Sequence, residues 1–529
     1  MQMQGALLLT ALAAVAAQAN SSDPLVVSTN VGTFRGFNTT ASVRTWLGIR
    51  FGAPANGTLR FRPPRRAQAI PKGTVFNATK YSPSCPELGG QNGSDLGGPR
   101  REYGEDCLSL NIWAPSVDRL NTSSSGANVL VWIYGGGFTG GSNALALYNG
   151  SNWVRDQNNT IIVGVNYRIN MFGFPTAGSG VELRDVNPGL QDQRLAVEWV
   201  YNNIANFGGD PEKITLFGQS AGAASIGAWP YAYQFDPIAR GLIMQSGSEF
   251  LTSSISSTNP TTAKVLWDTI ANRTGCAPNG TTTANVQSQF KCLQQVNFTT
   301  LYAAVRNFSG SNNFLPTPND FNVFNQSQYL AKGNRGEFAP LPVLIGTNEN
   351  EGTTLGSYGV SSEALVTRVA FTCPAGEVVG DRFNVTPSVP LWQYRYQGQW
   401  PNLNPPGSRL GSFHSSEISM VFGTYNLSRV ANATREQIAT SKLMQDAWTV
   451  FADSPSDGLK RAYNWSTADP EGNDLIVIGQ RNLSTVLFNR TDAYTFGCGG
   501  VYEDYFETGP DMPNNAIPVK RNLLSVLSF

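Results

Sequence analysis

The sequence predicts an α/β fold with a large, mainly parallel central sheet, helices on both faces of the sheet and long insertions. Short apolar, β-branched runs of strand length alternate along the chain with segments of helical periodicity. The chain has no repeat of fixed period and no low-complexity linker, which favours one elaborate domain. Alternating strands and helices are typical of a sheet that is buried on both faces.

Six apolar runs are predicted to form buried strands: Val129–Tyr134, Ile161–Asn166, Ile214–Phe217, Leu242–Met244, Val343–Ile345 and Leu475–Ile478. A helix is predicted over residues 191–207, because apolar residues recur there on one face: Ala196, Val200, Ile204 and Phe207. The turn sequence Gly208-Gly209-Asp210-Pro211 ends this helix. In such sheets the functional side chains lie in loops at the carboxyl ends of the strands.

The balance of charge excludes several classes of partner. The 529 residues include 37 basic and 37 acidic side chains, so the formal net charge is zero. A chain without a basic field offers no surface for nucleic acid or for an anionic membrane. Charged residues make up 14% of the chain, so Asn, Ser, Thr and Gly must supply much of the polar surface.

The first residues have the pattern of a secretory leader. An apolar run from Ala6 to Ala17 is followed by the small-residue cleavage pattern Ala17-Gln18-Ala19. We therefore expect a signal peptide over residues 1–19, a single domain over residues 20–529 and a secreted, extracellular protein. An apolar leader without a targeting role is the alternative. The run is too short to span a bilayer, and no later stretch approaches the ~18 apolar residues that a stable membrane insertion needs.

Sequons and cysteines are consistent with secretion. About nineteen Asn-x-Ser/Thr sequons between Asn20 and Asn489 predict N-linked glycans. The six cysteines are even in number and form no CxxC pair, so zinc or thioredoxin-type chemistry is not expected. Six cysteines allow about fifteen pairings, and spacing alone does not choose among them.

The pentapeptide Gly218-Gln219-Ser220-Ala221-Gly222 matches the G-x-S-x-G motif. A predicted strand comes directly before it, and a run of small residues opens a helix directly after it. This is the strand–turn–helix setting in which a nucleophilic serine is exposed on a sharp elbow. A Gly/Ser turn without chemistry is the alternative.

A serine hydroxyl becomes nucleophilic only when a base removes its proton, and the chain contains one histidine, His414. If a serine–histidine mechanism operates, His414 is the base. It follows Ser220 in the order serine, acid, histidine, within the polar stretch 411–416 that is predicted to be a loop. A surface or hydrogen-bonded core histidine is the alternative.

A carboxylate that orients the imidazole is expected between Ser220 and His414. Glu349 and Glu351 both follow the predicted strand Val343–Ile345, where the site is expected. The chemistry alone does not choose between them, and either could be a solvated loop acid.

Backbone amides are expected to bind the oxyanion of an acyl-transfer reaction. Gly135-Gly136-Gly137 directly follows a predicted strand, and glycine lets an amide approach a substrate oxygen closely. The amide of Ala221, next to the candidate nucleophile, is the natural further donor. A flexible turn is the alternative; a P-loop is excluded because no Gly-Lys-Ser/Thr follows.

Together these residues resemble the cholinesterase and type-B carboxylesterase family, which has the α/β-hydrolase fold. The resemblance covers nearly the whole mature chain. It is carried by the elbow and by the segments 46–51, 59–61, 105–113, 132–138, 166–168, 189–193, 207–211 and 245–248.

The resemblance implies a role for each candidate residue. Ser220 corresponds to the nucleophile, His414 to the base, and Glu351 to the acid because it precedes Gly352. Gly136, Gly137 and Ala221 match the positions of the oxyanion hole. The resemblance further implies the disulfides Cys85–Cys107, Cys276–Cys292 and Cys373–Cys498, a small-molecule ester as substrate, and no metal or cofactor.

Departures from the family's pattern bear on specificity. Gln219 stands where the family usually has Glu, and the loop between Cys85 and Cys107 has no Trp. A site without that carboxylate and that aromatic face binds a quaternary ammonium poorly, so choline esters are poor candidates. Ser415 replaces the glycine that usually follows the histidine, which affects local geometry.

The main hypothesis is therefore a secreted serine hydrolase that cleaves carboxylic esters through an acyl-enzyme. A triacylglycerol lipase of the same family is the alternative, although the polar, Gly-rich loop 86–103 offers little apolar surface to an oil interface. A non-catalytic binding protein on the same fold is the third hypothesis, and retention of all three candidate residues argues against it.

Overall fold

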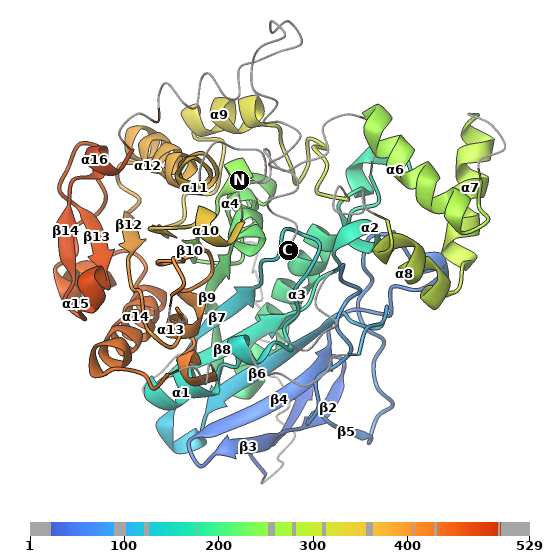
Figure 1. Ribbon diagram of the computed structural model, residues 1–529. Helices are drawn as coiled ribbons and strands as arrows, with labels where there is room; N and C mark the ends of the chain where they lie inside the picture. Colours follow the sequence, from blue (N-terminus) through green and yellow to red (C-terminus); the bar gives the residue numbers. More distant parts are fainter. Residues whose placement is uncertain are drawn as a thin grey trace, which may run out of the picture.

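The computed structural model describes residues 23–88, 102–120, 126–176, 178–251, 260–277, 282–308, 314–355, 363–404, 407–427, 431–495 and 498. The predicted leader, residues 1–19, lies outside these ranges. An 11-stranded mixed sheet forms the centre of the molecule, in the order β14-β13-β12-β11-β10-β9-β7-β8-β6-β4-β3 (Figure 1). The α/β class and the mainly parallel sheet predicted from the sequence are confirmed.

The parallel part of the sheet runs from β13 to β8 and contains all six predicted strands. Its strands are β7 (Ala127–Ile133), β8 (Thr160–Val165), β9 (Gly209–Gln219), β10 (Gly241–Gln245), β11 (Val343–Asn348), β12 (Leu391–Tyr396) and β13 (Leu475–Ile478). Antiparallel strands continue the sheet on both sides: β3 (Phe37–Thr40), β4 (Val43–Arg50) and β6 (Ser109–Pro115) on one, and β14 (Leu487–Asn489) on the other.

The antiparallel strands at the two margins of the large sheet, and the inner strand β12, were not predicted, because their sequences are not continuous apolar runs. Polar or charged side chains interrupt the apolar residues of both β4 (VRTWLGIR) and β12 (LWQYRY). A separate 3-stranded sheet, in the order β1-β2-β5, packs near β4. Its strands are β1 (Val26–Thr29), β2 (Gly32–Arg35) and β5 (Val75–Asn77).

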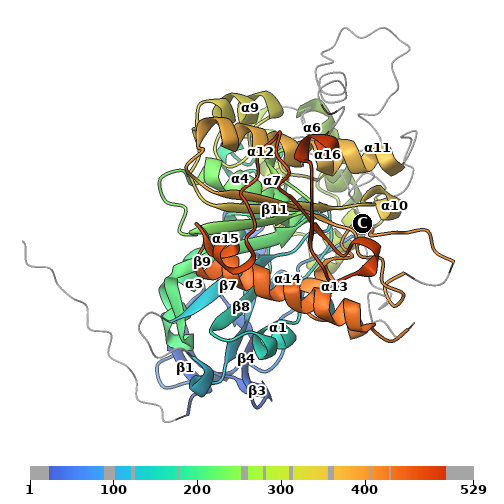
Figure 2. The ribbon, with the colours of Figure 1, turned by 90° about the vertical axis from the view of Figure 1, so that its left-hand side faces the viewer.

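Helices cover both faces of the large sheet. The helices α3 (Pro188–Asn203) and α4 (Ala221–Ala232) pack on one side, and α1 (Ser151–Asp156) and α14 (Arg435–Asp453) lie on the opposite side (Figure 2). The predicted helix over residues 191–207 starts earlier, at Pro188, and its last turn, Ile204–Phe207, is a 3-10 helix. Gly208, with φ of 97°, then ends it, as the turn sequence predicts.

Aromatic side chains fill the space between the sheet and the side that carries α1. Trp132 of β7 and Phe217 of β9 lie 4.9 Å apart between ring centroids. Trp153 and Phe422 close the same cluster, at 5.5 Å from Phe217 and 5.0 Å from Trp132 respectively. This packing fixes the two central strands, whose carboxyl ends lead into the candidate active site.

The insertions form two further groups of helices. On one side of the molecule (Figure 1), α2 (Asn170–Gly173), α6 (Pro260–Arg273), α7 (Thr283–Gln295) and α8 (Phe298–Arg306) surround a second apolar cluster that includes Phe61, Trp267 and Phe290. The other group comprises α9 (Gln326–Asn334), α10 (Gly352–Leu355), α11 (Glu363–Thr367), α12 (Cys373–Val385), α13 (Ile418–Val421), α15 (Gly458–Tyr463) and α16 (Thr491–Thr495).

Three disulfides link the chain: Cys85–Cys107, Cys276–Cys292 and Cys373–Cys498. These are the pairs that the family resemblance implies. The third closes a separation of 125 residues, and it attaches the segment after α16 to the start of α12.

Candidate active site

Ser220 lies at the junction of β9 and α4, as the motif predicts. Its backbone has φ of 55° and ψ of −124°, a strained conformation for a residue with a side chain. The Ser220 N–H donates to the carbonyl of Gln245 over 2.9 Å, and the Ser220 carbonyl accepts from Ala224 over 2.8 Å. The neighbouring strand and the new helix therefore hold the elbow from both sides.

Two glycines allow the backbone to pass close to this elbow. A Cβ on Gly222 would lie 2.0 Å from the carbonyl oxygen of Ile133, at the end of β7. A Cβ on Gly135 would lie 2.6 Å from the carbonyl oxygen of Gln219 and 2.8 Å from the Ser220 Cβ. The structure thus brings the glycine run after β7 into direct contact with the candidate nucleophile.

The glycine run turns sharply after this contact. Gly136 has φ of 110° and Gly137 has φ of 59°, in the region that favours glycine. The Gly136 carbonyl accepts from the amides of Thr139 and Gly140, each over 3.0 Å. Within the described part of the chain, neither the Gly136 nor the Gly137 amide donates to another backbone group, so both are available to a ligand. Ala221, in the first turn of α4, has an amide without an intrahelical acceptor.

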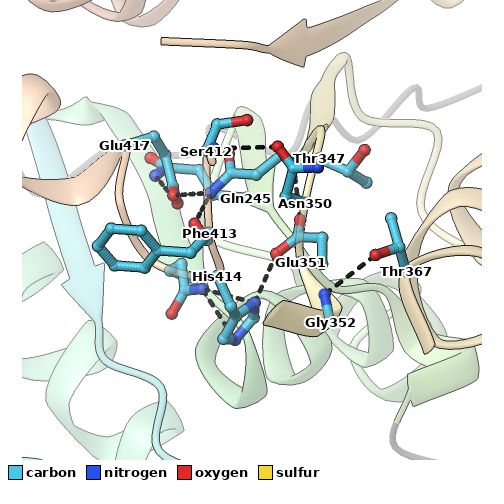
Figure 3. A network of polar contacts seen from close by, with 12 residues as sticks. Gln245, Thr347, Asn350, Glu351, Gly352, Thr367, Ser412, Phe413, His414 and Glu417 are labelled. Carbon is cyan, nitrogen blue, oxygen red and sulfur yellow. Dashed lines mark hydrogen bonds and ion pairs between the residues drawn. The ribbon is translucent and has the colours of Figure 1, made fainter. Parts of the chain in front are cut away.

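His414 contacts one of the two glutamates that sequence chemistry left open. Its Nδ1 lies 2.6 Å from Glu351 Oε2 (Figure 3). The other oxygen, Oε1, accepts from the Asn348 amide over 2.7 Å. Glu349 instead forms an ion pair with Arg395. Glu351 is fully buried and His414 nearly so, which shields their contact from water.

The other side of the imidazole faces the elbow. His414 Nε2 lies 3.1 Å from the side-chain nitrogen of Gln219, the residue directly before Ser220. When Nδ1–H donates to Glu351, Nε2 carries the lone pair and accepts from the Gln219 amide. Among the contacts of the described residues, the Ser220 hydroxyl makes no hydrogen bond to His414. The Gln219 amide instead occupies His414 Nε2, the nitrogen that would have to accept the Ser220 proton.

A second buried carboxylate, Glu417, lies beside this site and was not predicted. One oxygen accepts from Gln245 Nε2 over 3.1 Å, and both residues are labelled in Figure 3. The other oxygen accepts from Asn348 Nδ2 over 2.5 Å. Burial, followed by the charge of Glu351, raises the pKa of Glu417 to about 7. In the sequence, the feature that could have indicated Glu417 was its position three residues after His414, next to a polar loop.

Hydrogen bonds join the loop of His414 to the loop after β11. Asn348 Nδ2 donates to the Phe413 carbonyl over 2.8 Å. The Asn350 amide donates to the Ser412 carbonyl, and the Ser412 amide donates to Asn350 Oδ1, each over 3.1 Å. The predicted loop 411–416 is therefore irregular but closely held.

An aromatic ring supports the imidazole from the side. The rings of Phe371 and His414 lie 4.8 Å apart, and Phe371 belongs to a π-helical turn, Arg368–Thr372, that joins α11 to α12. Just before this turn, the Thr367 hydroxyl accepts from the Gly352 amide over 3.0 Å. The same segment thus contacts both His414 and the residue after Glu351.

The loop closed by Cys85 and Cys107 starts beside the glycine run. Glu87 accepts from the Gly141 amide over 2.9 Å, and the Leu88 amide donates to the Thr139 carbonyl. Residues 89–101, where the polar loop that bears on the esterase or lipase hypothesis continues, lie outside the described residues. The described base of the loop therefore borders the candidate oxyanion site.

The sequence model of the carboxylesterase family matches this chain over residues 23–365 and 357–496. The chain belongs to the carboxylesterase family. Its fold and its carboxylic-ester hydrolase activity follow from that membership. Among the described residues, no helix has the length and apolar character needed to cross a membrane.

Members of the carboxylesterase family that resemble this chain differ in their named activities. A chlorogenic acid esterase of Aspergillus niger is 33% identical, in an alignment that covers 89% of this chain and 94% of that esterase. Secreted lipase 5 of Gibberella zeae is 30% identical, over 88% of this chain and 92% of the lipase. A cholinesterase of Mus musculus is 32% identical, over 82% of this chain and 79% of that protein.

Proposed function

We propose that this carboxylesterase is a secreted serine esterase in which Ser220, His414 and Glu351 form the catalytic triad. The observation that carries the proposal is the imidazole of His414, held at Nδ1 by Glu351 and directed with Nε2 toward the elbow. Burial of Glu351 favours this role, because a buried carboxylate stabilises the imidazolium that forms during catalysis.

In the first half-reaction, Ser220 Oγ attacks the ester carbonyl carbon as its proton moves to His414 Nε2. This step requires Gln219 to release Nε2. The tetrahedral oxyanion accepts hydrogen bonds from the amides of Gly136, Gly137 and Ala221. When the intermediate collapses, the carbon–oxygen bond to the alcohol breaks and Nε2 returns the proton to the leaving oxygen.

In the second half-reaction, water attacks the acyl-enzyme and gives a proton to His414 Nε2. The second tetrahedral intermediate collapses, Ser220 Oγ regains a proton and the carboxylic acid leaves. Atoms balance over the cycle: one ester and one water give one alcohol and one acid.

The decisive experiment is ester turnover by Ser220→Ala and His414→Gln variants. Each should lose about 10⁴-fold or more in kcat/KM, as triad members do. Ser408→Ala, a change at an exposed serine outside the site, is the matched control and should retain wild-type kcat/KM. Wild-type turnover by either triad variant would remove the proposal. Labelling of Ser220 by a fluorophosphonate separates this enzyme from a non-catalytic binding protein.

The substrate class is a carboxylic ester without a quaternary ammonium group. Gln219 places a neutral amide beside the imidazole, so this position supplies no carboxylate to bind a cation. The relative named as a chlorogenic acid esterase makes chlorogenic acid one ester to test. The relative named as a secreted lipase favours a lipase as second candidate. Rates on soluble short-chain and emulsified long-chain esters distinguish the two.

Secretion with removal of residues 1–19 is part of the same proposal, and residues 20–529 form its single catalytic domain. The three disulfides and the sequons suit an oxidising, extracellular compartment. Amino-terminal sequencing of protein from the culture medium should start at Asn20. Protein that stays in the cell with its leader intact would contradict secretion but not the triad.

A further inference from the structure

Four phenylalanines are exposed in the described part of the chain: Phe76, Phe235, Phe383 and Phe488. Three of them directly precede an asparagine that begins an Asn-x-Thr sequon, namely Asn77, Asn384 and Asn489. With sequons this frequent, a phenylalanine placed at random precedes a sequon asparagine roughly once in thirty cases. Three pairs among four exposed phenylalanines exceed this rate, so we look for a physical reason for the pairing.

Two of these pairs lie on outer strands. β5 is an outer strand of the small sheet, and β14 is an outer strand of the large sheet. Their sequences are Val-Phe-Asn and Leu-Phe-Asn, and every residue in both is exposed. Side chains alternate along a strand, so each of these strands presents apolar side chains on both faces. The third pair lies near the end of α12.

An exposed apolar outer strand is a site for pairing with another chain. Proteins usually protect such strands by keeping them very short, or with lysine, proline or a β-bulge. β5 and β14 have three residues each, but they contain neither lysine nor proline and their pairing register is regular, so of these features only their shortness protects their apolar side chains. With 14% charged residues, the chain has few charges for this purpose.

The asparagines of these pairs have amide groups free for modification. Within the described part of the chain, no hydrogen bond uses Nδ2 of Asn77, Asn384 or Asn489, and all three are exposed. Asn482, another sequon asparagine, differs: it is half-buried, its Oδ1 accepts from the Gln399 amide over 2.7 Å and its Nδ2 donates to the Gln399 carbonyl over 2.8 Å.

We infer that Asn77, Asn384 and Asn489 carry N-linked glycans that screen the adjacent exposed phenylalanines and prevent further strand pairing at β5 and β14. The inference rests on the secretion proposed above. Asn Nδ2 forms a bond to C1 of the first sugar of a polyprenyl-diphosphate-linked oligosaccharide. The bond from C1 to the diphosphate oxygen breaks, the amide loses one proton, and the polyprenyl diphosphate leaves. The attached sugar is bulky and hydrated, so it replaces the missing charges.

Occupancy is the first test. The full chain is secreted from a yeast host, treated with an endoglycosidase that leaves one sugar, and analysed by peptide mass spectrometry. Sugar is expected on Asn77, Asn384 and Asn489, and Asn482 is expected to be bare. Secreted protein with sugar on other sequons but none on these three overturns the inference and leaves the proposed secretion intact. Protein that stays in the cell without sugar overturns both.

The second test is the association state of variants. A triple variant, Asn77→Gln, Asn384→Gln and Asn489→Gln, should lose its monomer peak in size-exclusion chromatography with light scattering, with kcat/KM per monomer unchanged. Adding Phe76→Thr, Phe383→Thr and Phe488→Thr should restore the monomer, because the screened rings are then absent.

The control removes three exposed sequons that have no exposed large apolar neighbour: Asn56→Gln, Asn272→Gln and Asn432→Gln. This variant should remain monomeric. A triple variant at Asn77, Asn384 and Asn489 that stays monomeric would overturn the screening role.

Discussion

The elbow of Ser220 and the loop of His414 lie side by side but are held in place by different forces. At the elbow, backbone packs against backbone: a Cβ on Gly222 would meet the Ile133 carbonyl at 2.0 Å, and the Ser220 amide is bonded to the Gln245 carbonyl. The His414 loop is held by polar side chains, with Asn348 bonded to both Glu417 and the Phe413 carbonyl. One half of the site therefore depends on volume and the other on charge and protonation.

This difference determines which changes each half tolerates. Close backbone packing does not respond to pH, but it leaves no room for an added methyl group. A buried polar network accepts changes of shape more readily, but a lost donor or an added charge leaves buried groups unpaired. Substitutions of similar size should therefore act on the two halves through different measurable quantities.

Among changes outside the proposed triad, the largest effect should come from Gly222→Ala. The added methyl group must displace the end of β7 or the elbow, and a shift of about 1 Å in a reacting group lowers kcat/KM by about a hundredfold. Gly380→Ala in α12 is the control, because nothing lies within 4 Å of its added Cβ. That variant should keep wild-type kcat/KM and gain about 1 kcal/mol in free energy of unfolding. Equal rates for the two variants would contradict close packing at the elbow.

A smaller loss should follow from Asn348→Asp. The new carboxylate faces Glu417 and cannot donate to the Phe413 carbonyl, so the His414 loop should move and kcat/KM should fall by about tenfold or more. Glu417→Gln in the same chain should recover part of the loss, since the amide can donate to the aspartate. A double-mutant cycle measures this coupling, expected at about 1–3 kcal/mol. Strict additivity would show that the two side chains act independently.

The buried polar side chains that hold the His414 loop should also make the free energy of unfolding depend on pH. Between pH 4.5 and about 7, folded Glu417 keeps a proton that the unfolded chain has released. The free energy of unfolding should therefore decrease as the pH rises through this range and level off above it. Urea unfolding of Glu417→Gln should show a decrease that is smaller by about 1–3 kcal/mol.

Glu249 provides the comparison for this measurement. Burial raises the pKa of Glu249 to about 7 as well, but it lies apart from the His414 loop, beside Tyr231 at the end of α4. Glu249→Gln should also flatten the pH dependence of stability while leaving the pH dependence of kcat/KM as in the wild type. An unchanged slope in both variants would show that neither group titrates in this range.

The smallest effect concerns Gln219, where the two halves meet. A general base must be unprotonated to accept the serine proton, so activity should rise with pH on the acid side of the rate profile. In Gln219→Glu, a carboxylate beside Nε2 favours the charged imidazole and should move this rise to higher pH by about one unit. Because His414 is the only histidine, ¹⁵N-histidine NMR observes the protonation state of this one ring directly. If the pH profile of kcat/KM were the same for Gln219→Glu as for the wild type, the contact between residue 219 and His414 Nε2 would be contradicted.

The Ser220 elbow could be predicted from the sequence, because its residues are consecutive in the chain. The elbow was predictable because five consecutive residues and the strand before them form one motif. His414 and the pair Glu349 and Glu351 were predictable as candidates. The family resemblance favoured Glu351, and the structure separates the two acids by contact: Glu351 meets His414, and Glu349 pairs with Arg395 on the unpredicted strand β12.

The polar support of His414 was not predictable. Asn348, Glu417 and Gln245 come from three distant stretches, and each is an ordinary polar residue until the fold buries them together. The fold was predicted best where strands are buried on both faces, as in β7 and β11. It was predicted poorly at the antiparallel margin, where charged side chains such as Arg44 interrupt the apolar pattern.

The π-helical turn that supports the imidazole ends at Cys373, which is bonded to Cys498. Phe371 therefore depends for its position on a covalent link to the last part of the chain that the structure describes. We expect cleavage of this link by a thiol reductant to loosen the segment next to the imidazole and to leave the packing of the central sheet intact. Ester hydrolysis should then slow at reductant concentrations that leave the circular dichroism spectrum unchanged.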